Sequence, residues 1–299
     1  MKLLKRLTLL LLLIPSVLIS LTYSLLEDDG SPKQGLVHLS RVLTQIRLLP
    51  EMPSRSRDEI NSAFQRHLRR KARTELRYLP ELSLRLSDEK RLRIAIENLG
   101  LEQPSPIIEP VSVDYLLVYG TTFSTAEKRI REASRLINFG LVTTQCVVLL
   151  PNDRQLTAKK ELGAFFSFLE NTELEDKIGF YKQYPSKCIE ANMLEDLWNH
   201  YSREPCVVID VPKKTPKLEL IDSLLAFKNF LPSKDTVLSL LPCVETPFAH
   251  RIIRQTHEFL SHEIPSLEII PHIFHAGHAK LPILLDEITK LLSVESSCW

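Results

Sequence analysis

Val113-Asp-Tyr-Leu-Leu-Val-Tyr119 is an almost continuous apolar run, and Gly120 ends it. An apolar run of this length without polar alternation is typical of a strand buried on both faces of a parallel sheet. An amphipathic helix is expected directly after it, from about Thr125 to Phe139, because small and aliphatic residues recur there every three or four positions. Gly140 can terminate that helix. A strand followed by such a helix is the repeating unit of α/β folds.

The same alternation continues to the C-terminal end of the chain. Apolar runs predict further strands, and the amphipathic stretches between them predict helices. The expected strands are Gln145–Leu150, Cys206–Val211, Thr236–Leu241 and Leu267–Ile270, and the expected helices are Lys159–Leu169, Ser186–His200, Leu218–Phe230, Phe248–His262 and Leu281–Leu292. Parallel strands joined in this way require right-handed crossovers. We therefore expect an α/β domain over residues 111–299, with a doubly wound, mostly parallel sheet of about five strands.

Residues 1–26 predict a membrane segment. A basic front at residues 2–6 precedes twenty uncharged residues, Leu7–Leu26, and acidic residues follow. As a helix this run would span about 30 Å, the thickness of the hydrocarbon core of a bilayer. The basic end is expected to stay cytoplasmic, which makes the chain a single-pass, membrane-anchored protein with its bulk on the extracytoplasmic side. A cleaved signal peptide is the alternative, with Thr22 and Ser24 as small residues before the cut, and the chain would then be secreted.

Residues 27–110 are expected to form a polar, helical region that ends in a proline-rich linker. Amphipathic patterns predict three helices. The first covers Leu36–Leu49, the second follows a possible N-cap at Asp58, and the third extends from Ser87 to Gly100. Basic residues are concentrated between 66 and 77. A solvated helix face explains them, and a basic patch for anionic lipid is the alternative.

Composition and motifs disfavour several classes of function. The 38 Lys and Arg residues balance 37 Asp and Glu residues, so nucleic acid is not expected as a partner. Only 8 of 299 residues are glycine, and neither a Gly-x-Gly-x-x-Gly nor a Walker loop occurs, which disfavours standard nucleotide sites. No Gly-x-Ser-x-Gly elbow occurs either. His272, His275 and His278 could hold zinc, but proline and glycine interrupt the segment and no carboxylate accompanies it, so no metal site is predicted.

Ligands of doubly wound sheets bind beyond the carboxyl ends of the strands. Gly120, Thr121 and Thr122 fall there, just before a helix, where backbone amides and hydroxyls could receive a phosphate or carboxylate. Cationic side chains follow neighbouring strands and could pair with that anion: Arg154, Lys213, Lys214 and Arg251. A small anionic or phosphate-bearing ligand is therefore predicted. The alternative is that the threonines cap the helix and the cations are solvated.

The order of these residues resembles the envelope family typified by SanA, ElyC and YdcF. The resemblance extends from about Val113 to Leu292 and rests on five stretches: Asp114–Gly120, Lys128–Ala133, Glu190-Ala191, Thr215 and Thr246–Arg251. It implies an α/β fold, a role in envelope maintenance, and site residues at the matching positions, Gly120, Arg129, Glu190, Thr215, His250 and Arg251. Some family members are thought to bind S-adenosylmethionine, so this cofactor is possible by resemblance alone.

The chain also departs from the family pattern. The family's Ser-Gly-Gly after the second strand is Pro151-Asn-Asp153 here, and its Asn-Thr-x-x-Asn is Lys214–Leu218, without either asparagine. Glu245 is the alternative to His250 for the position of the family's histidine. These departures indicate a divergent member, in which the site is altered or inactive.

We therefore expect a membrane-anchored or exported α/β protein that binds a small anionic ligand. Gly120–Thr122 would supply backbone donors, Lys214 and Arg251 would supply charge, Glu190 would orient the ligand, and His250 is the candidate for proton transfer. A non-catalytic envelope scaffold, with residues 31–100 as its partner surface, is the alternative favoured by the lost asparagines. A sugar-nucleotide transferase is a third option, by analogy of fold alone. The residues leave open whether the protein is an enzyme.

Overall fold

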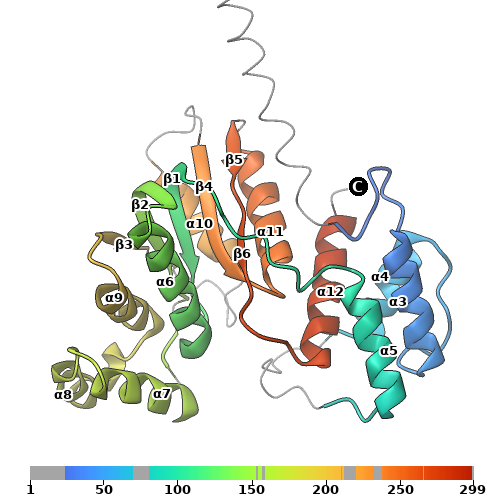
Figure 1. The fold of residues 1–299 in the computed structure, drawn as a ribbon, viewed down its shortest axis with the longest axis horizontal. Helices are drawn as coiled ribbons and strands as arrows, with labels where there is room; N and C mark the ends of the chain where they lie inside the picture. Colours follow the sequence, from blue (N-terminus) through green and yellow to red (C-terminus); the bar gives the residue numbers. More distant parts are fainter. Residues whose placement is uncertain are drawn as a thin grey trace, which may run out of the picture. The chain divides into compact units, whose positions relative to one another are not determined.

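The computed structural model describes residues 24–69, 81–152, 154–156, 159–209, 211, 220–231, 238–264 and 266–297. It divides the chain into two compact units (Figure 1). The α/β unit comprises Ser105–Glu245 and Gln255–Phe274. The helical unit comprises Met1–Pro104, Thr246–Arg254 and His275–Trp299.

The α/β unit contains a parallel sheet in which the strand order is β3-β2-β1-β4-β5, with β6 also paired to β4. The strands are β1 Val111–Tyr119, β2 Val142–Leu150, β3 Cys206–Val208, β4 Leu238–Glu245, β5 Leu267–Ile269 and β6 His272–Phe274. Every strand pairing that the structure describes is parallel. The predicted α/β class and mostly parallel sheet are therefore confirmed.

The carboxyl ends of the central strands lie at one edge of this sheet. β1 pairs with β2 from Val111 opposite Val142 to Tyr119 opposite Leu150, so these two strands end together. β4 lies on the other side of β1 and continues to Glu245. The strand order reverses between β1 and β4, which is the position where doubly wound sheets bind their ligands.

Helices cover both faces of the sheet (Figure 1). The helices on the faces are α6 Phe123–Asn138, α9 Glu190–Tyr201, α10 Leu220–Phe230 and the second half of α11 Ala249–Ser261. The unit also contains α7 Lys159–Glu170, which packs against α6, α8 Asp176–Gln183, which packs against α7, and a 3-10 turn at Pro185–Lys187. Leu116 and Val118 of β1 share a buried apolar cluster with α6 and α9. Side chains alternate along a strand, and Tyr115 accordingly contacts Phe227 of α10, with ring centroids 5.5 Å apart.

The helical unit consists of α3 Gln34–Gln45, α4 Arg57–His67, α5 Leu86–Glu97 and α12 Leu281–Ser296. We expected the last helix to complete the α/β domain over residues 111–299. Instead α12 packs with α4, and its leucines belong to the core of the helical unit. Eleven of its sixteen residues are buried, so α12 requires neighbours on most of its circumference, and the helices of this unit provide them.

Most of the predicted membrane segment, Leu7–Leu26, lies outside the described residues. Its last two residues are described: Leu25 and Leu26 are 0% and 3% exposed and belong to the core of the helical unit. Within the part of the chain that the structure describes, no helix is both long and apolar enough to cross a bilayer.

Candidate functional site

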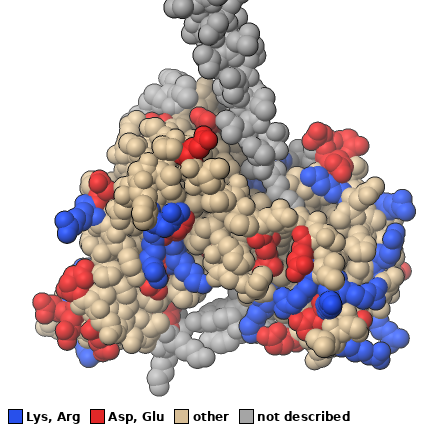
Figure 2. Space-filling view, viewed as in Figure 1, with Lys and Arg blue, Asp and Glu red and all other residues tan. Residues whose placement is uncertain are grey.

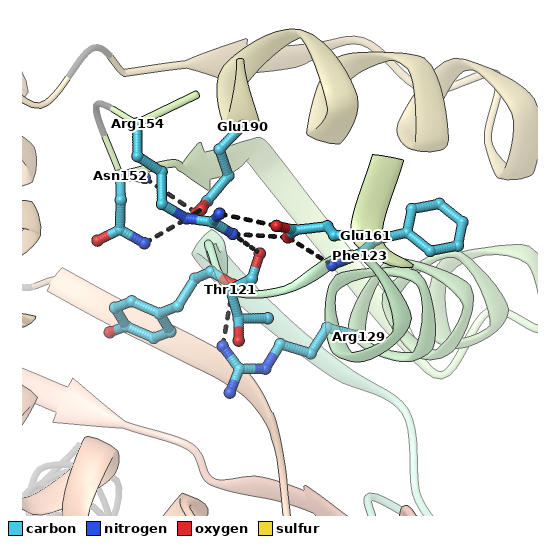
Figure 3. Close-up of polar contacts among 8 residues, drawn as sticks. Thr121, Phe123, Arg129, Asn152, Arg154, Glu161 and Glu190 are labelled. Atoms are coloured by element: carbon cyan, nitrogen blue, oxygen red, sulfur yellow. Dashed lines mark hydrogen bonds and ion pairs between the residues drawn. The ribbon is translucent and has the colours of Figure 1, made fainter. Parts of the chain in front are cut away.

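Four polar side chains meet beyond the carboxyl ends of β1 and β2 (Figure 3). Asn152 and Arg154 follow β2, Glu161 lies in the first turn of α7, and Glu190 is the first residue of α9. These four residues form the strand-end cluster. Glu161 and Glu190 are 5% and 0% exposed, whereas Asn152 and Arg154 are partly exposed. The two carboxylates of the cluster are thus buried, and its amide and guanidinium groups are more accessible to solvent.

Glu190 is held by the turn that follows β2. Its Oε1 accepts hydrogen bonds from the backbone N and the Nδ2 of Asn152, at 3.0 and 2.8 Å. Its Oε2 forms an ion pair with Nε of Arg154. Burial raises the pKa of Glu190, and the contacts with Arg154 and Asn152 oppose that rise without cancelling it. Glu190 thus lies beyond the carboxyl ends of β1 and β2.

Arg154 joins three segments of the chain. Its Nη1 and Nη2 donate to the two oxygens of Glu161 at 3.0 and 2.8 Å. Nη2 also donates to the carbonyl oxygen of Thr121, at 3.0 Å. Together with its contact to Glu190, Arg154 therefore connects the loop after β1 to α7 and α9.

Gly120 permits this close packing. A Cβ atom at this position would lie 1.9 Å from Glu190 Oε1 and 2.8 Å from the Cα of Pro151. The Gly120 N–H donates to the carbonyl oxygen of Leu150 at 2.7 Å. We expected this N–H to be a donor for a ligand, but the last residue of the neighbouring strand β2 already accepts it. The glycine is required here because the Glu190 carboxylate comes so close.

The first turn of α6 already binds a carboxylate. The N–H of Phe123 donates to Glu161 Oε1 at 3.2 Å. Thr122 is the N-cap residue of α6, and its side chain makes no capping hydrogen bond. The position at which we expected a ligand anion is thus occupied by an anionic group of the protein itself.

Arg129 and Glu245 form a second buried ion pair, where the strand order reverses. Nε and Nη2 of Arg129 donate to the two oxygens of Glu245 at 2.5 and 2.8 Å, and Nη1 donates to the carbonyl oxygen of Tyr119 at 2.9 Å. Arg129 and Glu245 are 3% and 2% exposed. Arg129 was predicted to bind a ligand. Instead it fastens α6 to the carboxyl ends of β1 and β4.

His250 and Arg251 belong to the helical unit. Nε of Arg251 donates to Glu287 Oε2 at 2.7 Å, and Glu287, which is 1% exposed, also contacts Lys290. Burial lowers the pKa of His250 to about 4, so its imidazole is neutral at neutral pH. Its role in proton transfer stays a prediction, because a neutral imidazole can still accept a proton. The predicted residues Lys214 and Thr215 lie outside the described residues.

Sequence reasoning missed the importance of Glu161 and Asn152, and it gave Arg154 only as a possible cation. The available signal was positional, because Asn152 follows a strand directly and Glu161 opens a helix, where a carboxylate is favoured by the helix dipole. Among the described residues, no group of three or more His, Cys, Asp and Glu side chains is arranged to hold a metal ion. His272 lies on β6, where its Nε2 contacts Glu132 and its Nδ1 accepts the N–H of Ile107.

The structure describes some of the residues on which the resemblance to the SanA, ElyC and YdcF family relies. Gly120, Arg129 and Glu190 lie at the carboxyl edge of the sheet. His250 and Arg251 make their described contacts in the helical unit. No protein-family model matches the chain, and no curated protein matches its sequence. Membership of that family therefore stays a prediction.

Proposed function

We propose that this chain is an exported or membrane-anchored α/β protein that binds a small carboxylate- or phosphate-bearing ligand at the strand-end cluster. The observation that supports this most directly is the carboxylate of Glu161, which is bound by Phe123 N–H and by both Nη atoms of Arg154. A helix N-terminus and a forked guanidinium are the donors with which proteins bind anions. The anionic group of the ligand would take the place of Glu161.

The charges of the cluster favour a ligand anion that replaces the Glu161 carboxylate over one that binds beside it. Arg154 faces two carboxylates, Glu161 and Glu190, so a further anion would bring like charges together at a buried site. Replacing Glu161 by a singly charged ligand leaves the balance unchanged. Thr121, Thr122 and Asn152 are partly or fully exposed next to this position and can contact the remainder of the ligand. Acidic and basic side chains are interspersed on the described surface in Figure 2, which agrees with a small ligand better than with nucleic acid.

A thermal-shift screen of the full chain tests the proposal. The panel contains inorganic phosphate, S-adenosylmethionine, nucleotides, sugar nucleotides and short polyprenyl phosphates. A ligand at a hundred times its Kd should add about 2.7 kcal/mol of stability. Glu161→Gln keeps the shape but removes the competing charge, and we expect it to bind the ligand at least about tenfold more tightly.

Two variants complete the screen. Arg154→Ala should abolish the shift. Arg135→Ala is the matched control, because it removes another paired arginine from the far end of α6, where its partner is Glu132, and it should leave the shift unchanged. A panel that stabilises neither the native chain nor Glu161→Gln would contradict the proposal.

A scaffold is the second candidate function. It is supported by α5, on which Leu86 and Ile94 are 82% and 45% exposed, and by the internal pairing of Arg129 and Arg154. In a scaffold, Leu86→Ser with Ile94→Ser should abolish crosslinking to an envelope partner, and Arg154→Ala should not. The same double variant should leave any ligand-induced shift intact.

A further inference from the structure

The backbone nitrogen of Leu25, near the start of the described residues, meets a buried carboxylate. This nitrogen lies 2.9 Å from Oε2 and 3.2 Å from Oε1 of Glu295 on α12. Leu25 and Glu295 are 0% and 1% exposed. Both belong to the helical unit, so the contact does not depend on the strand-end cluster.

The geometry suits a different donor from a peptide N–H. A peptide nitrogen carries one hydrogen, yet both oxygens of Glu295 lie within hydrogen-bond distance of Leu25 N. An α-ammonium group carries three hydrogens, as a lysine ammonium does, and it can donate to both oxygens separately. If Leu25 were the amino terminus, its α-ammonium group could therefore donate one hydrogen bond to each oxygen of Glu295.

The charge of Glu295 leads to the same conclusion. Burial raises the pKa of Glu295 to about 7, although the Leu25 N–H, the Ser24 hydroxyl and the charges of Arg254 and Lys33 act to lower it. A buried carboxylate is unfavourable unless an opposite charge lies close to it. An α-ammonium, whose ordinary pKa is about 7.7–8.0, would place a full positive charge at Leu25 N.

The sequence offers a cut at the same bond. Thr22 and Ser24 are the small residues at the third and first positions before Leu25, after a basic front and an apolar run, which is the pattern of a secretory signal. Within the described residues, the backbone of Leu25 and Leu26 is also fixed in the helical unit, and the Leu26 N–H donates to the Ser24 hydroxyl at 3.0 Å. The Leu25 carbonyl oxygen accepts the N–H of Lys33 at 3.0 Å, and Leu26 forms a bridge with Pro32.

We propose that the Ser24–Leu25 peptide bond is a processing site, and that Glu295 binds the α-ammonium group which processing creates. A membrane-bound signal peptidase adds water across this bond. The C–N bond breaks, the water oxygen joins the Ser24 carbonyl carbon to form a carboxylate, and the released Leu25 amine takes up the protons as an ammonium. Leu25 is fully buried in the folded unit, so the cut precedes folding. The mature chain is then secreted, with its first residue paired to α12.

The first test is the amino terminus of the protein made from the full chain in a bacterium with an active secretion pathway. Intact mass and terminal peptide sequencing should show that the exported protein begins at Leu25. Thr22→Tyr places a bulky side chain three residues before the cut and should keep residues 1–24 attached. A native protein that retains residues 1–24, or that is cut at another bond, would overturn the proposal.

The second test asks whether Glu295 recognises the new terminus. Glu295→Gln is compared in the processed protein and in the uncut Thr22→Tyr protein, in the same detergent. We expect Tm to fall by at least about 5 °C in the processed form, because a buried ion pair is broken, and to change much less in the uncut form. Equal shifts in both forms would show that Glu295 only accepts a peptide N–H, and would overturn the ammonium pairing.

A direct measurement covers the case in which Glu295→Gln does not fold. The pKa of the Leu25 α-ammonium in the processed native protein, followed by NMR, should lie above its ordinary range of about 7.7–8.0 because the carboxylate favours the charged form. An ordinary or lowered pKa would contradict the pairing. None of these tests involves the strand-end cluster, so they can fail independently of the proposed ligand site.

Discussion

At Gly120 the backbone leaves β1 directly against the carboxylate of Glu190, and a side chain has no room there. An added Cβ would lie 1.9 Å from Glu190 Oε1 and 2.9 Å from the carbonyl oxygen of Leu150. The backbone contact cannot be relieved by a change of rotamer. We expect Gly120→Ala to lower the free energy of unfolding by about 2–3 kcal/mol, measured by urea denaturation.

Gly163 provides the control for this substitution. It lies within α7, and nothing is within 4 Å of a Cβ built on it. Gly163→Ala should therefore raise the free energy of unfolding by about 0.5–1 kcal/mol. Equal effects of the two substitutions would mean that the contact between Gly120 and Glu190 is not the source of the loss.

His250 gives a prediction that depends on pH. Burial lowers its pKa from the usual 6.5 to about 4, so between these pH values the unfolded chain binds a proton that the folded imidazole does not. Stability is therefore complete above about pH 6.5 and decreases as the pH falls towards 4, by about 3 kcal/mol from this group. His250→Gln should lack this part of the loss. Urea denaturation of both proteins at pH 7 and pH 4 measures this loss. If the free energies of unfolding of the native protein and His250→Gln differ by the same amount at both pH values, the lowered pKa of His250 is contradicted.

Among the elements, α6 and the carboxyl end of β4 are joined by the buried pair of Arg129 and Glu245. Removing one partner leaves an uncompensated buried charge, so Arg129→Met should lower the free energy of unfolding by about 3–5 kcal/mol. Arg129→Met combined with Glu245→Leu removes both charges and should restore at least about 2 kcal/mol of that loss. Arg93→Met is the control, because Arg93 and Glu89 are about 40% exposed and such pairs contribute less than about 1 kcal/mol.

The sequence predicts an element well where a local pattern determines it. The apolar runs of β1 and β2 were predicted because a strand buried on both faces needs apolar residues throughout. α8 was missed because it is short and buries only Ile178 and Tyr181. β4 was expected to end at Leu241, before a proline, yet Pro242 pairs with Leu117 and the strand continues to Glu245.

The candidate site was predictable to the extent that it follows the strand ends. Gly120 was predicted from its place after a strand and Glu190 only from the family resemblance, and the structure places the two against each other. The partners of the arginines were not predictable, because Arg129 and Glu245 are 116 residues apart and no local pattern relates them. Arg154, which follows a strand, was therefore expected to be available to a ligand, although Glu161 of α7 and Glu190 of α9 already pair with it.

For the whole molecule, the helical unit is assembled from separate parts of the chain. We expected contiguous regions over 27–110 and 111–299, but α12 contributes to the core around α3, α4 and α5. Periodicity shows that a helix has an apolar face, and it does not show which surface covers that face. The unit to which α12 belongs could be found only from its packing.

The dependence of the helical unit on α12 can be tested by reconstitution. Helices of 11 or 12 residues such as α3, α4 and α5 are marginal alone. α12 packs against α4 and contributes six fully or nearly buried side chains to the apolar cluster that all four helices share, Leu281, Leu284, Leu285, Ile288, Leu291 and Leu292, each worth about 1.5–3 kcal/mol when buried. We expect a fragment of residues 25–104 to show little helix by circular dichroism, and to gain helix when a peptide of residues 275–299 is added. The same peptide with Leu285→Ser and Ile288→Ser should not restore it, and a fragment that is fully helical alone would show that the first three helices form a core without α12.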